Sequence, residues 1–438
     1  MAMANDLHKL KKVLIISYYW PPSGGGGVQR WLKMSKYLPE YGWQPIIFTP
    51  SNGESPVVDE SLLDEVHSAV ETIKTPIWEP YSFYKRFTGK KSSEKVYSGF
   101  INDKKESFTQ KLSVFIRGNF FIPDARKFWI KPSIKYLRKY LLEHPVDRII
   151  STGPPHSTHL IASGVVDKIP IPWVADFRDP WTNIDFYDQL RLSKWADKKH
   201  RALEQKVLRK ATKIVTVSEH WAKDFEKLSG RPIEVIRNGY DHADFEQEPS
   251  NLGEAFTICH IGSMNKDRNP SALWQALESL VASPSFAANL SIKLIGNVDH
   301  SIFDAINKHG LNVYLDHTPF MVHKEALSEL QKSQLLLLPI NDTPNSLGVV
   351  PGKIYEYLGA RRPIIGIGPS DGDSATILSD SGAGTMFAYD DSSGIEAKID
   401  GIYKDYLNGN VSKPSGKIMK YSRQSMAKQY AALLQDLT

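Results

Sequence analysis

Short apolar runs alternate with segments of helical period along most of the chain. Residues 11–17 (KKVLIIS) form a continuous apolar run, a glycine-rich turn follows, and residues 28–38 place their apolar side chains mainly on one side of a helix. A second apolar run covers residues 44–50. Strands buried on both faces and joined by amphipathic helices are typical of parallel sheets. The chain is therefore predicted to begin with a strand–helix–strand unit.

The same alternation continues to residue 368. Further strands are predicted over residues 146–155, 170–181, 211–218, 256–263, 290–296, 312–317, 335–340 and 362–368. Helices are predicted between them, over residues 156–166, 219–230, 269–282, 301–310, 323–333 and 352–360. This pattern predicts an α/β protein with two Rossmann-like, doubly wound parallel-sheet domains.

A polar stretch at residues 239–254 separates the two series. We therefore expect an N-terminal domain over residues 1–240 and a C-terminal domain over residues 241–420. A last amphipathic segment, residues 421–438, is predicted to form a helix that packs back on the N-terminal domain. At 438 residues and 41% hydrophobic content, the chain is long enough for two or three domains.

One stretch, residues 81–148, interrupts the alternation. It carries sixteen Lys and Arg residues against six Asp and Glu, interleaved with aromatic residues. One interpretation is a solvated insertion, and the other is a patch for an acceptor or for an anionic membrane surface. Nucleic acid is not expected as a partner, because the net charge of +5 is mild and no nucleic-acid-binding motif accompanies the basic residues.

The remaining composition narrows the class of protein. Cys259 is the single cysteine and lies in an apolar run, so we expect a small core residue and no disulfide within the chain. The sequence has neither the apolar stretch of a signal peptide nor a run long enough to span a bilayer. We expect a cytoplasmic protein, at most peripheral to the inner face of the cell membrane.

A glycine run, Gly24, Gly25, Gly26 and Gly27, follows the first predicted strand and opens a helix. Glycines let the backbone approach a ligand closely, and a helix start attracts phosphate. A flexible turn is the alternative. The spacing does not fit the dinucleotide fingerprint, so an NAD-dependent dehydrogenase is disfavoured.

Lys353 and Glu356 lie three residues apart, directly after Pro351-Gly352 at a predicted helix start. A lysine there adds positive potential for a diphosphate, and a glutamate one turn further in can accept bonds from both hydroxyls of a ribose. The alternative is an ordinary surface ion pair.

These residues belong to a segment, PGKIYEYLGARRPIIGIG, that resembles the donor-binding helix of retaining GT-B glycosyltransferases, especially family 4. The early glycine run, VIRNGYD and IGSMNKDRNPSAL resemble the same family, and the likeness covers nearly the whole chain except the middle insertion. It implies two domains with a cleft between them. The N-terminal domain would hold the acceptor and the C-terminal domain the nucleotide sugar.

The resemblance also assigns roles to residues. Glu356 would hold the ribose, Lys353 and Arg268 would face the diphosphate, and the backbone of Gly348, Val349 and Val350 would cradle phosphate or sugar. The four glycines would close on the diphosphate, and Asn238-Gly239 would form the interdomain turn. Two positions depart from the family pattern. Gly348 stands where a sugar-contacting glutamate is usual, which leaves that role empty or moves it to Asn345 or Asp342. Ser263 stands where a phosphate-binding arginine is usual, leaving Arg268, with Lys266 near it.

Two further clusters follow predicted strands, where ligands gather in α/β folds. The resemblance assigns His156 to catalysis through contact with the transferred sugar; a capping or core histidine, with His159 beside it, is the alternative. Asp176, Arg178 and Asp179 would contact the acceptor or form a buried ion pair.

No residue cluster has the spacing of a metal site, and Asp371-Gly372-Asp373 is interpreted as a helix cap. We therefore expect a metal-independent glycosyltransferase without a cofactor. It would use a nucleotide diphosphate sugar as donor and a glycan or lipid-linked acceptor, in polysaccharide biosynthesis. The alternatives are a non-catalytic nucleotide-sugar-binding protein and a nucleotide-sugar epimerase of the same fold.

Overall fold

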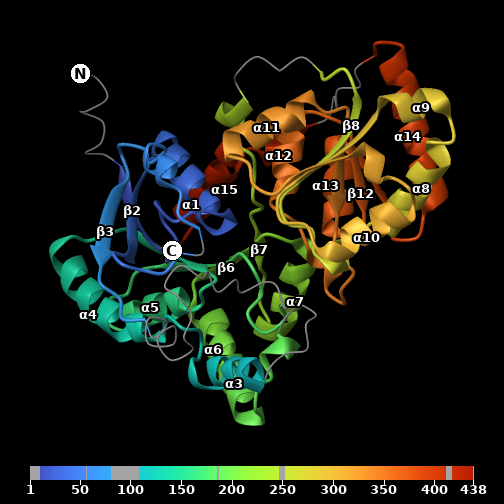
Figure 1. The fold of residues 1–438 in the computed structure, drawn as a ribbon. Helices are drawn as coiled ribbons and strands as arrows, with labels where there is room; N and C mark the ends of the chain where they lie inside the picture. Colours follow the sequence, from blue (N-terminus) through green and yellow to red (C-terminus); the bar gives the residue numbers. More distant parts are fainter. Residues whose placement is uncertain are drawn as a thin grey trace. The chain divides into compact units, whose positions relative to one another are not determined.

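The computed structural model describes residues 10–55, 57–79, 108–184, 187–245, 252–410 and 417–437. The chain divides into two compact units, each with its own sheet (Figure 1). The first unit comprises residues 1–237 and 424–438, and the second comprises residues 238–423. Residues 80–107 of the basic, aromatic stretch lie outside the described residues.

The sheet of the first unit has seven parallel strands in the order β3-β2-β1-β4-β5-β6-β7. Parallel pairing sets Val13 opposite Pro45 on one side and opposite Arg148 on the other. The strands are β1 (Lys11–Ile16), β2 (Trp43–Pro50), β3 (Glu71–Thr75), β4 (Arg148–Gly153), β5 (Trp173–Phe177), β6 (Lys213–Thr216) and β7 (Glu234–Val235). The order reverses between β1 and β4, as in doubly wound folds.

Helices cover this sheet. Val13 and Ile15 of β1 pack in one apolar cluster with Trp31 of α1 and with Tyr430 and Leu434 of α15, so the C-terminal helix helps to cover one face. Helix α5 packs against β1 and β4. The helices are α1 (Gly26–Tyr37), α3 (Phe108–Phe120), α4 (Lys127–Glu143), α5 (Ser157–Val166), α6 (Lys194–Lys210), α7 (Glu219–Ser229) and α15 (Arg423–Gln435).

The second unit repeats the plan with six parallel strands in the order β10-β9-β8-β11-β12-β13. The strands are β8 (Phe256–Ile261), β9 (Leu290–Ile295), β10 (Leu315–Thr318), β11 (Leu335–Pro339), β12 (Ile364–Ile367) and β13 (Gly384–Phe387). The helices are α8 (Ser271–Leu280), α9 (Pro284–Asn289), α10 (His300–Lys308), α11 (His323–Lys332), α12 (Lys353–Ala360), α13 (Asp373–Ser381) and α14 (Ser392–Leu407).

Alternate residues of each strand in the second unit enter two separate cores. In β8, Ile258 packs in the cluster that includes residues of α8 and α14, whereas Cys259 packs in the cluster that includes residues of α11, α12 and α13. Figure 1 shows these two sets of helices on opposite faces of the sheet. Cys259 is fully buried, as its apolar surroundings in the sequence predict.

The predicted two α/β sheets are confirmed, but several elements escape the sequence pattern. Helix α6 is missed because most of its 17 residues are charged or polar, so its buried stripe is hard to see. Strands β3 and β13 are short edge strands with little apolar signal. The segment Asp371-Gly372-Asp373 lies at the start of α13, as predicted, with Gly372 as the N-cap residue and without a side-chain cap bond.

Candidate donor site and its surroundings

The loops that follow β8 and β11 meet the start of α12 at the carboxyl edge of the second sheet. Ligands of doubly wound folds gather at this edge. Helix α12 begins at Lys353 after the N-cap residue Gly352, and its aligned peptide dipoles give the helix start a partial positive charge. The sequence-predicted donor residues of the second unit lie in these loops and in this helix.

The ammonium group of Lys353 turns toward the end of β8. Its Nζ lies 3.0 Å from Nε2 of His260, a histidine that is fully buried. Gly262 makes room for this side chain, because a Cβ added there would lie 3.2 Å from Nζ. Gly262 also has a φ of +90°, which side-chain-bearing residues rarely adopt.

Arg268 ties two loops together at the same place. Its Nε donates to Oδ1 of Asn341, after β11, and its Nη1 donates to the carbonyl of Ser263, 3.1 Å away, after β8. Ser263 itself is exposed, so it contributes a backbone oxygen to the position of Arg268. The structure thus brings the two predicted cations, Lys353 and Arg268, to one edge of the sheet.

The charges of Lys353 and Arg268 influence the ionisation of the groups around them. Burial and the charge of Arg268 hold the pKa of Lys353 well below its usual value, and the weaker influence of Glu356 opposes them. Burial and then the charge of Lys353 likewise hold the pKa of His260 well below its usual value. An arriving anion would relieve the repulsion between the cations.

Glu356 does not pair with Lys353 here. Its Oε1 lies 3.1 Å from Nε2 of His323 at the start of α11, and both side chains are partly exposed. The carboxylate is therefore within reach of solvent and is held by the His323 ring. The surface ion pair with Lys353, the alternative interpretation of the spacing, is not the arrangement observed.

The backbone of residues 348–350 is partly engaged already. The N–H groups of Gly348 and Val349 donate to the carbonyls of Asn345 and Ser346 in a 3-10 turn, and the Val349 carbonyl accepts from Ser374. Val350 is buried. A backbone cradle for phosphate or sugar at these residues stays a prediction.

The glycine run of the first unit forms the start of α1. Gly25 is the N-cap residue with a φ of +85°, Gly24 donates to the Val57 carbonyl, and no heavy atom would meet a Cβ at Gly25 or Gly26. The Gly27 carbonyl accepts from Arg178 Nη1 at 2.6 Å. The loop is therefore held at both ends and open at Gly25 and Gly26, and its role in binding a ligand stays a prediction.

Arg178 links this loop to the neighbouring one. Its Nη2 donates to the Pro154 carbonyl, and Asp179 lies 3.8 Å from its Nε. Arg178 and Asp179 are partly buried and directly follow β5, whereas Pro154 directly follows β4. Their arrangement gives Arg178 a positioning role for the glycine run.

Asp176 lies in the core of the first unit and is fully buried. Its carboxylate accepts bonds from five donor atoms: Arg30 Nε and Nη2, Trp31 Nε1, Thr152 Oγ1 and Tyr430 Oη. Of the two interpretations of this aspartate, the buried ion pair describes what the structure shows. Sequence reasoning did not find Arg30 or Tyr430 as its partners.

His156 and His159 lie side by side at the start of α5. The ring of His156 stacks on Trp181 at 4.6 Å and 1°, and Nδ1 of His159 lies 2.8 Å from Ser151 Oγ. Burial and the neighbouring His159 hold the pKa of His156 well below its usual value, so the ring is neutral. His156 is buried, with 8% of its surface exposed, and its contact with the transferred sugar stays a prediction.

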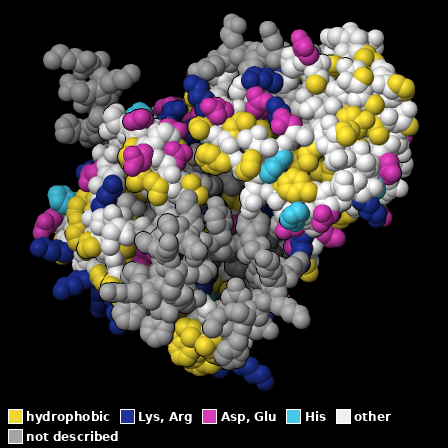
Figure 2. Space-filling model, viewed as in Figure 1, with side chains coloured by type: hydrophobic (Ala, Val, Ile, Leu, Met, Phe, Trp, Pro, Cys, Tyr) yellow, Lys and Arg dark blue, Asp and Glu magenta, His cyan; other side chains and the backbone are white. Residues whose placement is uncertain are grey.

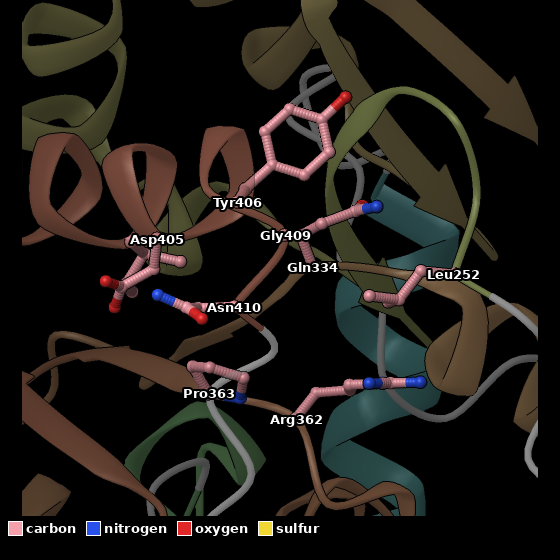
Figure 3. A pocket seen from close by; sticks show the side chains of 9 residues that line it. Leu252, Gln334, Arg362, Pro363, Asp405, Tyr406, Gly409 and Asn410 are labelled. Carbon is pink, nitrogen blue, oxygen red and sulfur yellow. The ribbon is translucent and has the colours of Figure 1, made fainter.

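A pocket of the second unit lies elsewhere. It is lined by Leu252, Gln334, Arg362, Pro363, Ile402, Asp405, Tyr406, Gly409 and Asn410 (Figure 3). Gln334 directly precedes β11 and Pro363 directly precedes β12, so the pocket lies at the amino ends of these strands. Since ligands of this fold gather at the carboxyl ends, it is not the donor site.

Two features are absent from the described residues, a metal-binding cluster and a membrane-spanning helix. Within the ranges given above, no three His, Cys, Asp or Glu residues cluster as metal ligands. Among the helices of the described part of the chain, none is long and apolar enough to cross a membrane.

Comparisons with known proteins bear on the family. Residues 100–244 match the model of Glycosyltransferase Family 4. Among curated proteins, none matches this sequence.

Solved structures share the fold over nearly the whole chain. The chain is similar to Anabaena HepE in complex with UDP, at 13% identity, 98% and 100% coverage and a TM-score of 0.63. It is similar to TarM at 13% identity, with 98% of this chain and 100% of that chain covered and a TM-score of 0.65. A putative UDP-N-acetylglucosamine 2-epimerase from Listeria monocytogenes also matches, at 8% identity, with 97% of this chain and 96% of that chain covered and a TM-score of 0.54. At these identities the likeness concerns the fold. Residues 100–244 thus resemble Glycosyltransferase Family 4, and the two parallel-sheet units share the fold of GT-B glycosyltransferase structures.

Proposed function

We propose that this protein transfers a sugar from a nucleotide diphosphate sugar to a hydroxyl of a glycan or lipid-linked acceptor, with retention of configuration, in polysaccharide biosynthesis. One observation carries the proposal. Lys353 and Arg268 meet at the carboxyl edge of the second sheet, with Glu356 one helical turn beyond Lys353. Two cations followed by a carboxylate suit a diphosphate followed by a ribose.

The chemistry follows from these charges. In the transfer, the bond from the sugar C1 to the phosphate oxygen breaks and a bond from C1 to the acceptor oxygen forms on the same face. The acceptor proton passes to the leaving phosphate oxygen. Lys353 and Arg268 stabilise the charge that develops on that phosphate, and the helix start adds to their field.

The other residues position the reactants. Glu356 exchanges its bond to His323 for the hydroxyls of the ribose. His156 contributes a neutral hydrogen-bonding group for the transferred sugar, and the first unit holds the acceptor.

A thermal-shift panel of UDP-, GDP-, ADP- and CMP-sugars tests the donor part of this proposal. We expect one nucleotide sugar to raise Tm, and the shift to disappear in Glu356→Ala. Glu325→Ala removes an exposed carboxylate at the start of α11 and is the matched control, which should keep the shift. No shift with any of the four would overturn the assignment.

The alternatives give different products from the same donor. An epimerase, which the fold also accommodates, would convert the donor sugar without any acceptor. A non-catalytic binding protein would keep the thermal shift yet neither transfer nor hydrolyse the donor. Mass spectrometry of the donor, with and without a glycan acceptor, separates the three outcomes, and the proposal requires nucleoside diphosphate release that depends on the acceptor.

We also infer peripheral contact with an anionic membrane through α3. Leu112, Phe115, Ile116 and Phe120 are each 40–62% exposed and recur at the spacing of one helical face. Figure 2 shows hydrophobic side chains gathered where Figure 1 places α3 and α6. Nζ of Lys127 lies 4.9 Å from the centre of the Phe128 ring, and Nζ of Lys199 lies 4.8 Å from the centre of the Trp195 ring.

Vesicle sedimentation tests this surface. Vesicles of phosphatidylcholine with about one-third phosphatidylglycerol should bind the protein, because basic side chains add roughly 1 kcal/mol each near an anionic surface. Phe115→Ser with Ile116→Ser should release it. Val313→Ser, which changes an exposed residue of the second unit, should not. Equal binding of all three proteins would refute the membrane contact.

A further inference from the structure

We infer that His260 is a positioning residue that holds the ammonium of Lys353 where the donor diphosphate binds. This inference rests on the proposed function and adds a residue to it. His260 is the penultimate residue of β8, directly before Ile261, and it is fully buried. Its two hydrogen-bond partners are the Leu337 carbonyl and Lys353, and the Ser263 backbone also acts on the ring. Neither its spacing nor its neighbours in the sequence mark it as part of a site.

The two partners fix the tautomer of the His260 ring. Its Nδ1 lies 3.0 Å from the Leu337 carbonyl oxygen, which can only accept, so Nδ1 carries the proton. In a neutral ring the other nitrogen, Nε2, then has a lone pair and accepts. Lys353 Nζ, 3.0 Å away, is the donor that it faces. His260 therefore connects the backbone of β11 to the side chain of α12.

The surrounding bonds make this connection rigid. Tyr357, one turn after Lys353, donates to the same Leu337 carbonyl at 3.2 Å and accepts from the Ile261 N–H at 3.1 Å. The helix that carries Lys353 is thus tied to both β8 and β11. A flexible lysine held in one geometry loses less conformational entropy when a ligand arrives.

The ionisation of the cluster supports the same role. Burial, with the charge of Lys353 second, keeps the pKa of His260 low, so the ring stays neutral and Nε2 stays an acceptor. Burial, with Arg268 second and Glu356 in opposition, lowers the pKa of Lys353. Tyr357 also faces the group, and burial raises its pKa well above the usual value. Binding of a diphosphate should raise the pKa of Lys353 again.

Two substitutions separate the bonds of His260. His260→Asn can still donate to the Leu337 carbonyl but is too short to offer Lys353 an acceptor. His260→Gln places its Oε1 near the former Nε2 and keeps that acceptor. Calorimetric titration would use whichever of UDP, GDP and ADP the wild-type protein binds, together with the matching nucleoside, which lacks the diphosphate.

We expect His260→Asn to weaken the nucleoside diphosphate about tenfold and to leave the nucleoside unchanged, because only the diphosphate meets Lys353. His260→Gln should stay within about threefold of the wild-type protein. Unchanged nucleoside binding also shows that the variant is folded. If His260→Asn binds the diphosphate as well as the wild-type protein, the inference is overturned.

A double-mutant cycle shows whether His260 acts through Lys353. In a Lys353→Met background, His260→Asn should have no further effect on diphosphate binding. The same tenfold loss in that background would contradict the positioning role. If the wild-type protein binds none of the three nucleoside diphosphates, the proposed function itself fails, and that outcome is distinct from both of the others.

Discussion

The guanidinium of Arg30 meets the carboxylate of Asp176 through two bonds, Nη2 to Oδ1 at 2.9 Å and Nε to Oδ2 at 3.1 Å. Both residues are buried, and 146 positions separate them in the chain. Burial alone would raise the pKa of Asp176, but Arg30 and the hydrogen bonds outweigh it and the pKa is lowered. The pair joins α1 to β5, and Tyr430 joins α15 to both.

Neutralising this aspartate should destabilise the first unit. Asp176→Asn leaves Arg30 buried without its counter-charge, and loss of one partner of a buried pair costs about 3–5 kcal/mol. Urea unfolding would measure the loss. Asp179→Asn, which changes a partly exposed neighbour, is the control and should stay within about 0.5 kcal/mol. A loss below about 1 kcal/mol for Asp176→Asn would show that the pair is not a structural centre.

Gly262→Ala should affect both stability and ligand binding. Its φ of +90° makes any side chain unfavourable by about 1–2 kcal/mol, and the new Cβ would displace the Lys353 ammonium. Gly230→Ala is matched in backbone conformation, with a φ of +68° and no atom near the added Cβ. Both variants should lose stability in thermal unfolding, but only Gly262→Ala should bind the nucleoside diphosphate less tightly. If the two variants bind the nucleoside diphosphate with equal affinity, Gly262 is not part of the donor site.

The free energy of unfolding should decrease as the pH is lowered, because His159 is buried as a neutral ring. Burial lowers its pKa to about 3, against the opposing charge of Asp176, whereas the unfolded value is about 6.5. Below pH 6.5 the unfolded chain takes up a proton that the folded protein does not, so stability is complete above 6.5 and falls toward pH 3. His159→Asn should reduce that slope by about 1.4 kcal/mol per pH unit in urea unfolding between pH 4 and 6. An unchanged slope would mean that the folded protein protonates this ring readily.

Transfer should continue when metals are removed. Lys353 and Arg268 supply positive charge where the leaving diphosphate would lie, so the proposed mechanism does not require a cation bridge. The measurement is the rate of nucleoside diphosphate release before and after dialysis against EDTA. Strict recovery of activity by Mg²⁺ or Mn²⁺ would contradict the metal-free mechanism.

The sequence is sufficient to predict the layers of the fold. Runs such as VLII in KKVLIIS and FTICHI in FTICHIGS place apolar residues at both inward and outward positions, as expected for a sheet covered on both faces. The helices between them have a clear apolar face. The edge strand β13 and the charged helix α6 lack these signals, because their stability comes from tertiary contacts that a local pattern does not record.

The site is predicted only as far as its residues are close in sequence. Lys353 and Glu356 share a helix, so their proximity follows from helical geometry. His260 is 93 positions from Lys353, and its role depends on the pairing of β8 with β11. Arg30, Asp176 and Tyr430 likewise come together only in the folded unit. The periodic pattern of apolar residues does not predict buried polar contacts between residues that are distant in the sequence.

The central claim is that the start of α12 binds the diphosphate of the donor. A crystal structure of the protein with the nucleoside diphosphate that gives the largest thermal shift tests it most directly. We expect phosphate oxygens within hydrogen-bond distance of Lys353 Nζ and Arg268, and the ribose hydroxyls on Glu356. A nucleotide bound in the pocket beside Arg362 would contradict this account. So would a nucleotide whose phosphates make no contact with Lys353, so that its ammonium still contacts only His260.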